Sequence, residues 1–268
     1  MPADTMRFGF GKNWENYIRQ HFSEERVEIS RKHLLDFLQL PNLEGKYFLD
    51  VGCGSGLHSL AALRAGAARI VSFDFDPNAV RTTARLKAYA GNPSHWTVIT
   101  GSILDDAFLK TIEPADIVYS WGVLHHTGEM WRAVENSVKL MKNDGLLYIA
   151  LYTDDPYFGH PKQYWVEVKK KYNRAGWLGR KRMELWYFWE FYLNRRLTAL
   201  PELIRQSREY KKSRGMAMYT NAVDWLGGWP FEFASVKEVQ QFGVGKLGLT
   251  LANLGTGQAN AEYLFKAH

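Results

Sequence analysis

The residues with the clearest capacity for binding chemistry form a short cluster near the start of the sequence. Asp50 lies in the apolar run Tyr47–Val51, and glycines follow at positions 52, 54 and 56. Beyond them, the segment 57–63 carries apolar residues at helical spacing. A strand, a glycine turn and a helix start together bring backbone N–H groups to a ligand at the positive end of a helix. The spacing therefore predicts a ligand-binding turn at this point of the chain.

A further carboxylate ends the next apolar run. Asp74 closes the run Ile70–Asp74, 18 positions after Gly56 (74 − 56 = 18). A carboxylate at this place can accept hydrogen bonds from both hydroxyls of a ribose. Asp76 stands directly before Pro77, a residue favoured at the first position of a helix, so we interpret Asp76 as a helix cap. Asp74 is therefore the candidate for ribose binding.

Two adjacent histidines follow the apolar run Ile117–Trp121. A neutral imidazole, with a pKa of about 6.5, can take a proton from a hydroxyl or an amine, so His125 and His126 are candidate bases. One of the two could instead cap the following helix. No metal site is predicted, because no third ligand stands at a recognisable spacing. Asp154 could orient a histidine or a substrate hydroxyl, although Asp155-Pro156 beside it also suits a simple turn.

The order of strands and helices from Lys46 to Tyr152 would hold these candidates together. Alternating strands and helices with short turns predict a parallel sheet covered on both faces, whose ligands bind beyond the carboxyl ends of the strands. Each candidate above lies at or just after such an end. The expected strands are Tyr47–Val51, Ile70–Asp74, Trp96–Thr100, Ile117–Trp121 and Leu146–Tyr152, with helices near 57–67, 77–89, 105–112 and 130–142.

These segments resemble the motifs of one enzyme family. The run Asp50-Val-Gly-Cys-Gly-Ser-Gly56 resembles the first motif of class I S-adenosylmethionine-dependent methyltransferases. Leu57 stands where a dinucleotide-binding fingerprint would have its third glycine, which argues against NAD or FAD. Val123-Leu-His-His126 is similar to the motif after strand 4 in the ubiquinone-type and related small-molecule enzymes, methyltransferase types 11 and 12. The resemblance implies an α/β, Rossmann-like fold with a seven-stranded, mostly parallel sheet and S-adenosyl-L-methionine as the cofactor.

The resemblance also implies roles for individual residues. Asp74 would bind the ribose, and Phe75 would lie against the adenine. Ser102 stands where the family usually has a carboxylate, and its hydroxyl would accept more weakly from the adenine amino group. The expected cofactor-binding residues are Asp50, Gly52, Gly54, Gly56, Asp74, Phe75, Ser102, Ile103, Trp121 and Trp14, and the catalytic candidates are His125, His126 and Asp154.

The expected organisation has four parts: an N-terminal extension at 1–45, a cofactor-binding core at 46–155, an inserted helical lid after strand 5 at 156–235, and closing strands of the sheet at 236–268. In the extension, Ser23 is the expected N-cap of a helix. Phe8, Phe10 and Trp14 either pack against the domain or cover the cofactor. The closing strands are expected at Leu249–Leu254 and Glu262–Lys266, joined by a Gly255-Thr-Gly257 turn.

The lid is rich in aromatic residues and in positive charge. Between Pro161 and Arg214 there are 15 Lys or Arg and 5 Glu, a local charge of +10 (15 − 5) against +6 for the chain. This excess favours an acidic substrate. Because aliphatic residues are few, we expect the lid helices to pack over the sheet without a core of their own, with the segment Leu185–Leu193 buried. The arginines expected to approach the substrate from this lid are Arg174, Arg180, Arg182, Arg195, Arg196, Arg205, Arg208 and Arg214.

Composition sets the broad class. A chain of 268 residues suits one large domain with an appendage, and Cys53, its single cysteine, excludes an internal disulfide and fits a reducing compartment. The segment Met1–Arg7 lacks the apolar stretch of a secretory signal, and no apolar run approaches the ~20 residues of a transmembrane helix. The sequence therefore predicts a cytoplasmic protein without a transmembrane segment.

We expect methyl transfer from S-adenosylmethionine to an oxygen of a small molecule that carries an acidic group. The alternative is an RNA methyltransferase acting on a transfer RNA wobble base, because such enzymes share the histidine-bearing motif and basic aromatic surfaces suit RNA. A third possibility, a non-catalytic cofactor-binding subunit, would not need the histidine pair. The sequence leaves the acceptor and the oligomeric state open.

Overall fold

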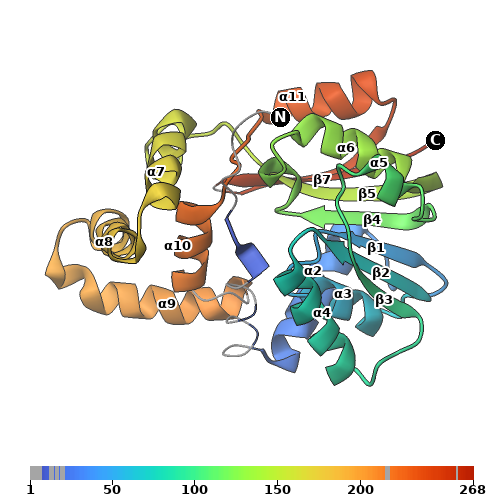
Figure 1. Cartoon of the computed structure of the whole chain (residues 1–268), viewed down its shortest axis with the longest axis horizontal. Helices are drawn as coiled ribbons and strands as arrows, with labels where there is room; N and C mark the ends of the chain where they lie inside the picture. Colours follow the sequence, from blue (N-terminus) through green and yellow to red (C-terminus); the bar gives the residue numbers. More distant parts are fainter. Residues whose placement is uncertain (1–7, 12–14, 16–17, 19–21, 215–217, 258) are drawn as a thin grey trace.

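A seven-stranded sheet forms the centre of the protein (Figure 1). The computed structural model describes residues 8–11, 15, 18, 22–214, 218–257 and 259–268, with the backbone alone for 208–214. The strand order is β3-β2-β1-β4-β5-β7-β6. The strands are β1 (Tyr47–Val51), β2 (Arg69–Asp74), β3 (Trp96–Thr100), β4 (Ala115–Trp121), β5 (Met141–Tyr152), β6 (Thr250–Thr256) and β7 (Asn260–Lys266).

The first five strands are parallel, and β7 runs antiparallel to both of its neighbours. Along β5 and β7, Tyr148 lies opposite Leu264. The chain order reverses between β1 and β4, which places a crevice at the carboxyl ends of these two strands. The predicted α/β, Rossmann-like fold with a mostly parallel seven-stranded sheet is confirmed.

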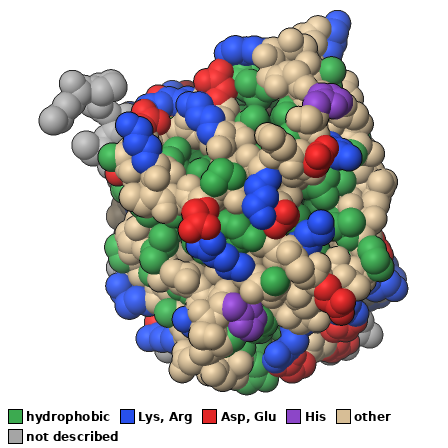
Figure 2. All heavy atoms as spheres, turned by 90° about the vertical axis from the view of Figure 1, so that its right-hand side faces the viewer, with side chains coloured by type: hydrophobic (Ala, Val, Ile, Leu, Met, Phe, Trp, Pro, Cys, Tyr) green, Lys and Arg blue, Asp and Glu red, His purple; other side chains and the backbone are tan. Residues whose placement is uncertain are grey.

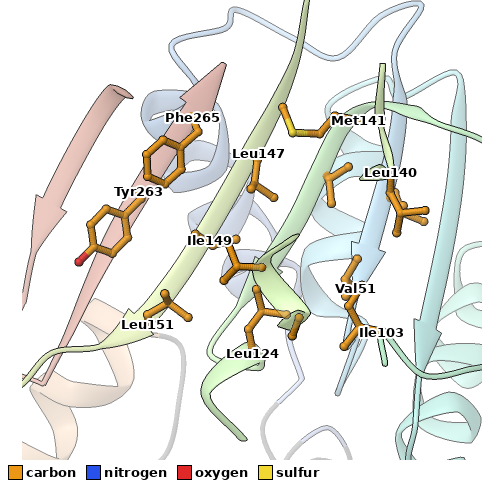
Figure 3. Packing of buried hydrophobic residues seen from close by; sticks show 14 of the residues in the cluster. Val51, Ile103, Leu124, Leu140, Met141, Leu147, Ile149, Leu151, Tyr263 and Phe265 are labelled. Atoms are coloured by element: carbon orange, nitrogen blue, oxygen red, sulfur yellow. The ribbon is translucent and has the colours of Figure 1, made fainter. Parts of the chain in front are cut away.

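Helices cover both faces of the sheet because successive strand residues point to opposite sides. Phe48 packs with the helices of one face and Leu49 with those of the other. Figure 3 shows the second cluster, with Ile149 and Leu151 of β5 beside Leu124. The first face is covered by α2 (Glu24–Leu38), α3 (Leu57–Arg64) and α4 (Pro77–Tyr89), and the second by α5 (Asp106–Leu109), α6 (Met130–Lys139) and α11 (Val236–Gln240), which continues into a π-helix (Gln241–Lys246).

Polar caps fix where several of these helices begin. Ser23 accepts from the backbone N–H of Arg26 at the start of α2, and Asp76 accepts from that of Asn78 at the start of α4. Both predicted caps are confirmed. The expected helix at 105–112 is shorter than predicted, since Asp105 is the N-cap of α5 and the helix ends at Leu109. The helix expected to reach residue 142 ends at Lys139, because Met141 enters the sheet opposite Ala115.

The predicted turn between the last two strands is shifted. Gly255 pairs with Glu262 and Thr256 with Ala261, so both residues belong to β6 and the connection begins at Gly257.

The insert after β5 is helical and lies beyond the carboxyl ends of the parallel strands (Figure 1). Contrary to expectation, it has a core of its own, built from aromatic rings that replace aliphatic side chains. Trp225 packs against Tyr157 and Trp165, with ring centroids 4.2 and 5.3 Å away. Its elements are α7 (Lys162–Arg174), α8 (Trp177–Tyr187), a π-helix (Phe188–Tyr192), a 3-10 turn (Leu197–Ala199), α9 (Leu200–Arg214) and α10 (Met218–Gly227).

The prediction that Leu185–Leu193 is buried holds only in part. Tyr187 is fully buried, whereas Leu185 is 72% exposed and Trp189 39% exposed. One face of this aromatic segment therefore meets solvent. None of the helices within the described ranges combines the length and apolar character that a membrane span requires.

Candidate functional site

A cavity of about 1580 Å³ lies between the carboxyl ends of the parallel strands and the lid. One end is lined by the glycine turn after β1 and by the residues that follow β2 and β3. The other end is lined by aromatic side chains of the lid and of the N-terminal segment, namely Phe8, Phe10, Tyr152, Tyr157, Phe158, Phe191, Tyr192, Trp225 and Trp229. The cavity thus joins a turn-lined end to an aromatic end.

The glycine turn is fixed by close contacts. Gly52 has φ 77°, and a Cβ added there would lie 2.4 Å from Val123 Cγ1. Gly56 has φ 78°, and a Cβ there would come within 2.9 Å of Thr83. Only glycine suits both positions, because left-handed backbone and close packing coincide. Gly52 and Gly54 line the cavity, whereas Gly56 lies behind it and shapes the turn.

Asp50 links the turn to the sheet. Its Oδ2 accepts from the Ser59 hydroxyl, and Ser59 Oγ lies 2.7 Å from Ser72 Oγ, which in turn accepts from the Trp96 indole at 2.8 Å. Burial raises the pKa of the Asp50 carboxyl to about 7. Asp50 lines the cavity and at the same time ties β1 to α3 and β2.

Asp74 is held at the end of β2 by two backbone groups. The N–H of Gly54 donates to Oδ2 at 3.0 Å, and the N–H of Asp76 donates to Oδ1 at 2.8 Å. Each carboxylate oxygen can accept a second hydrogen bond, so both can receive a hydroxyl from the cavity. Burial raises the pKa of this carboxyl to about 6. The geometry fits the two hydroxyls of a ribose.

The residues after Asp74 and after β3 shape the space beside it. Phe75 lines the cavity and is 60% exposed. Ile103 is buried and also faces the cavity, and Ser102 accepts from the backbone N–H of Leu104 at 3.1 Å. A hydroxyl oxygen can accept a second bond. Phe75, Ser102 and Ile103 therefore share the cavity wall with Asp74.

Trp121 lines the cavity, but its indole N–H is used within the protein. It donates to Glu262 Oε1 at 3.1 Å, while the Tyr148 hydroxyl donates to Oε2 at 2.6 Å. Glu262 was not predicted as a site residue, because it lies 141 residues from Trp121 and its strand showed only a closing hairpin. Trp121 can therefore offer its ring to a ligand, and not its N–H.

His126 is held in one tautomer. Its Nδ1 lies 2.6 Å from the carbonyl oxygen of Pro230, which can only accept, so Nδ1 carries the proton and Nε2 the lone pair in the neutral ring. The ring lines the cavity, and Phe10 covers it at a centroid distance of 4.9 Å. Burial lowers the pKa of His126 to about 3. The ring is therefore neutral at physiological pH and can accept a hydrogen bond at Nε2.

His125 is buried beside it, with its ring centroid 3.9 Å from that of Tyr152. Within the described part of the chain, neither ring nitrogen has a hydrogen-bond partner. Burial holds the pKa of His125 well below its usual range, and the nearby charges of His126, Lys169 and Lys162 lower it further. Neither histidine caps a helix through its side chain.

Glu232 was missed by the sequence reasoning and caps α6. Its carboxylate accepts from the backbone N–H groups of Gly128 at 2.9 Å and of Met130 at 3.1 Å. The segment that carries Glu232 also carries Pro230, whose carbonyl holds His126. The loop after β4 is thereby fixed by a segment about 100 residues away in sequence.

The N-terminal segment crosses the cavity. The N–H of Phe8 donates to the carbonyl of Trp229 in the lid at 3.2 Å, and the N–H of Gly11 donates to Asp76 of the core at 2.9 Å. Phe8 and Phe10 both line the cavity between these anchors. Of the two alternatives for these aromatics, the structure places the described ones over the cavity. Trp14 lies outside the described residues.

Two expectations about charged residues are not met. Asp154 is exposed and does not line the cavity. No described lysine or arginine side chain lines it either, so the lid arginines whose side chains are described do not approach the acceptor end, and the side chains of Arg208 and Arg214 lie outside the described part of the chain. Arg180 donates to backbone carbonyls, Arg195 pairs with Glu190, and Arg205 pairs with Glu202. Among the described residues, no group of three or more His, Cys, Asp or Glu could hold a metal ion.

Comparison with known proteins gives matches to the segment that contains the glycine turn. Residues 49–147 match the family described as a methyltransferase domain. Over 90 residues the chain is 32% identical to the ribosomal protein L11 methyltransferase of Helicobacter hepaticus, a match that covers 30% of this chain and 28% of that protein. Over 107 residues it is 32% identical to the tRNA U34 carboxymethyltransferase of Aeromonas hydrophila subsp. hydrophila, covering 40% of this chain and 32% of that protein. The chain thus spans less than a third of the length of these relatives.

The likeness in structure extends over the whole chain. The magnesium protoporphyrin IX methyltransferase of Synechocystis PCC 6803, solved with bound S-adenosylhomocysteine, superposes with a TM-score of 0.54 and 13% identity. The match covers 96% of this chain and 94% of that one. At this identity the likeness concerns the fold.

Proposed function

Since the chain belongs to the S-adenosylmethionine-dependent methyltransferases, with its methyltransferase domain at residues 49–147, we propose that it transfers a methyl group to an oxygen of a small molecule that carries an acidic group. The observation that carries the proposal is the cavity. It joins the end lined by the glycine turn and Asp74 to the aromatic end, beside the neutral ring of His126.

Four groups fit the cofactor. Asp74 has acceptor capacity for the ribose hydroxyls, and the turn at Gly52 and Gly54 allows a close approach of the ligand. Phe75 and Ile103 flank the place of the adenine. Leu57 stands where a dinucleotide-binding turn has its third glycine, which favours S-adenosylmethionine over dinucleotides. The solved structure of similar fold with bound S-adenosylhomocysteine supports the same ligand.

S-adenosylmethionine supplies an electrophilic methyl group on a positively charged sulfur. The protein's part is to align the acceptor oxygen and to receive its proton. When the acceptor oxygen takes the methyl group, the electron pair of the broken carbon–sulfur bond would stay on sulfur. The proton of the acceptor hydroxyl would pass to His126 Nε2 or to water. The bond from His126 Nδ1 to Pro230 keeps Nε2 free for this role.

The aromatic acceptor end favours a small molecule. Phe8 and Phe10 cross the cavity and the lid lies over it, so a folded nucleic acid would have to displace both. A transfer RNA substrate stays the alternative because of the likeness to the tRNA U34 carboxymethyltransferase. Against it, the exposed lid arginines Arg195 and Arg205 are paired with glutamates and offer little free positive charge to a phosphate backbone.

Labelled methyl transfer over a panel of acceptors tests the proposal. S-adenosylmethionine labelled in its methyl group is offered with hydroxybenzoic acids, sugar acids, phospholipid headgroups and transfer RNA. We expect label in an ether or ester of an acidic small molecule. Label in RNA alone establishes the alternative. Cofactor binding without transfer to any acceptor would instead indicate a non-catalytic cofactor-binding subunit.

A further inference from the structure

Two lysines of the lid are buried, which is unusual for this residue type. Lys162 and Lys169 stand seven positions apart on α7, on one face of the helix, and are 1% and 0% exposed. A buried ammonium is costly unless a partner compensates it, and burial lowers the pKa of Lys162 to about 8 and holds that of Lys169 well below its usual range. Within the described residues, neither lysine forms an ion pair with a carboxylate. The other charged or titratable groups near them are Asp154, Asp155, Asp224, His125 and His126.

Aromatic rings surround both ammonium groups. Lys169 Nζ donates to the backbone carbonyl of Trp225 and lies 4.3 Å from the Trp225 ring and 4.4 Å from the Phe231 ring. Lys162 Nζ lies 5.3 Å from the ring of Trp225 and 5.7 Å from that of Tyr152, and among the described residues it has no hydrogen-bond partner. The faces of the rings attract an ammonium but do not restore the usual pKa of either lysine, so a bound anion would be needed to hold both amines in the charged form.

The same rings form the acceptor end of the cavity. Tyr152 and Trp225 line it, so each ammonium lies one ring behind the cavity wall. The wall also holds polar atoms without a partner in the described part of the chain: the Trp225 indole N–H and both nitrogens of His125. Buried polar groups of this kind are normally satisfied, so their clustering points to a ligand.

We propose that Lys162 and Lys169, protonated when the site is occupied, form a wall behind Tyr152 and Trp225 that binds the acceptor through a negatively charged oxygen. The inference rests on the function proposed above and names the groups that would recognise the acidic substrate. The oxygen is either the ionised hydroxyl that receives the methyl group or a carboxylate beside it. The positive charge acts through the rings, and the buried Trp225 N–H has no partner among the described residues.

This wall explains two features of the site. The lid's positive charge reaches the acceptor through buried lysines, although its described arginines lie elsewhere. A nearby positive charge also lowers the pKa of an acceptor hydroxyl. This reduces the basicity that His126 Nε2 needs in order to receive the proton, in agreement with the low pKa of the ring. The lysines are thus specificity-determining residues and not proton acceptors.

Binding of small probes tests the wall without turnover. The protein, saturated with S-adenosylhomocysteine, is titrated with 4-nitrophenol, benzoate and neutral nitrobenzene. The first reports an ionisable hydroxyl through its visible phenolate absorbance, and the second reports a carboxylate. The variants are Lys162→Met and Lys169→Met, which leave an apolar chain among aromatic rings and should fold. Lys171→Met is the matched control, because Lys171 is exposed on the same helix.

We expect both anionic probes to bind the wild type and the Lys171→Met variant equally, with the bound nitrophenol ionised at a lower pH than in water. Lys162→Met and Lys169→Met should each weaken the anions about tenfold or more and leave nitrobenzene unchanged. If only nitrophenol loses affinity in these variants, the lysines recognise the hydroxyl that receives the methyl group. If only benzoate loses affinity, they recognise the carboxylate beside it.

Equal weakening of all three probes, no weakening of either anion, or failure of every probe to bind the wild type would each overturn the proposal. Lys162→Arg adds a check, since a charge-preserving change should retain more anion affinity than Lys162→Met. Retained binding of S-adenosylhomocysteine in every variant keeps these outcomes separate from a failure of the proposed function, which would show as absent methyl transfer.

Discussion

At the scale of single residues, Asp74 is the proposed ligand of the cofactor's ribose. Replacing Asp74 with Ala removes both acceptor oxygens, and we expect S-adenosylmethionine binding to weaken by about 1–3 kcal/mol, which calorimetry would measure. Because burial raises the pKa of this carboxyl to about 6, it is ionised above that pH and protonated below it. Affinity should therefore fall as the pH drops below 6.

Asp74→Asn is the control for this pH dependence, because its weaker affinity for S-adenosylmethionine should not change with pH in this range. An unchanged affinity for Asp74→Ala would move the ribose contact elsewhere.

His126 gives a second prediction at this scale. Replacing it with Ala should lower kcat by about 10²–10⁴-fold and leave S-adenosylhomocysteine binding intact. Burial lowers its pKa to about 3, so the ring stays neutral from pH 8 to pH 5. With cofactor saturating, kcat of the wild type should show no loss near the ordinary imidazole pKa in this range. A loss centred near that value in the wild type and absent from His126→Ala would contradict the buried, neutral ring.

The sequence predicts some residues of the candidate site and not others, because local patterns do not reveal contacts between distant segments. Asp74 and His126 follow strand ends, so local pattern alone places them at the cavity. The tautomer of His126 depends on Pro230, and the orientation of Trp121 depends on Glu262, and both partners come from distant segments. Lys162 looked like one of many surface lysines, because its burial arises only from packing within the lid.

At the scale of elements, the N-terminal segment acts as a strap between the core and the lid. A Cβ at Gly11 would lie 2.6 Å from both Ala79 N and Asp76 Oδ2, whereas one at Gly9 meets nothing within 4 Å. We therefore expect Gly11→Ala to lift the strap and to weaken cofactor binding by about 1 kcal/mol or more, with Gly9→Ala as the neutral control. Calorimetry of both variants checks this. Equal affinities would mean that the strap covers the cavity without holding the cofactor.

The start of α6 offers a prediction about stability. Glu232 satisfies two backbone N–H groups there from the partly buried Pro230 segment. Glu232→Ala should lower the free energy of unfolding by about 1–2 kcal/mol, measured by urea denaturation. Glu129→Ala is the matched control, because Glu129 is an exposed neighbour whose side chain makes no cap bond. A smaller loss for Glu232 than for Glu129 would show that the cap is dispensable.

The elements themselves were largely predictable, and the lid was not. The ranges of β1, β3 and α4 agree with expectation, because apolar runs, Pro77 and the Asp76 cap mark their limits locally. The lid was expected to lack a core, since it has few aliphatic residues. The aromatic rings of the lid pack on one another instead, and no periodic pattern in the sequence predicts this arrangement.

At the scale of the whole molecule, the distribution of charge separates the two classes of acceptor. The chain carries a net charge of +6. On the face turned away from the lid, basic and acidic side chains are interspersed (Figure 2). A transfer RNA held by many phosphate contacts would lose affinity by about 10³–10⁵-fold between 50 and 200 mM salt. We expect the KM of the true acceptor to change little over this range, and a steep rise would support RNA.

The most direct test of the central claim is calorimetric titration of the intact chain with S-adenosylmethionine, S-adenosylhomocysteine and NAD. Asp74 and Phe75, the proposed contacts of the ribose and the adenine, line the cavity at the glycine turn, and Leu57 stands where a dinucleotide-binding turn has its third glycine. We predict binding of one molecule of either sulfur compound, with dissociation constants of similar size, and no binding of NAD. Binding of NAD without binding of S-adenosylmethionine would contradict the account.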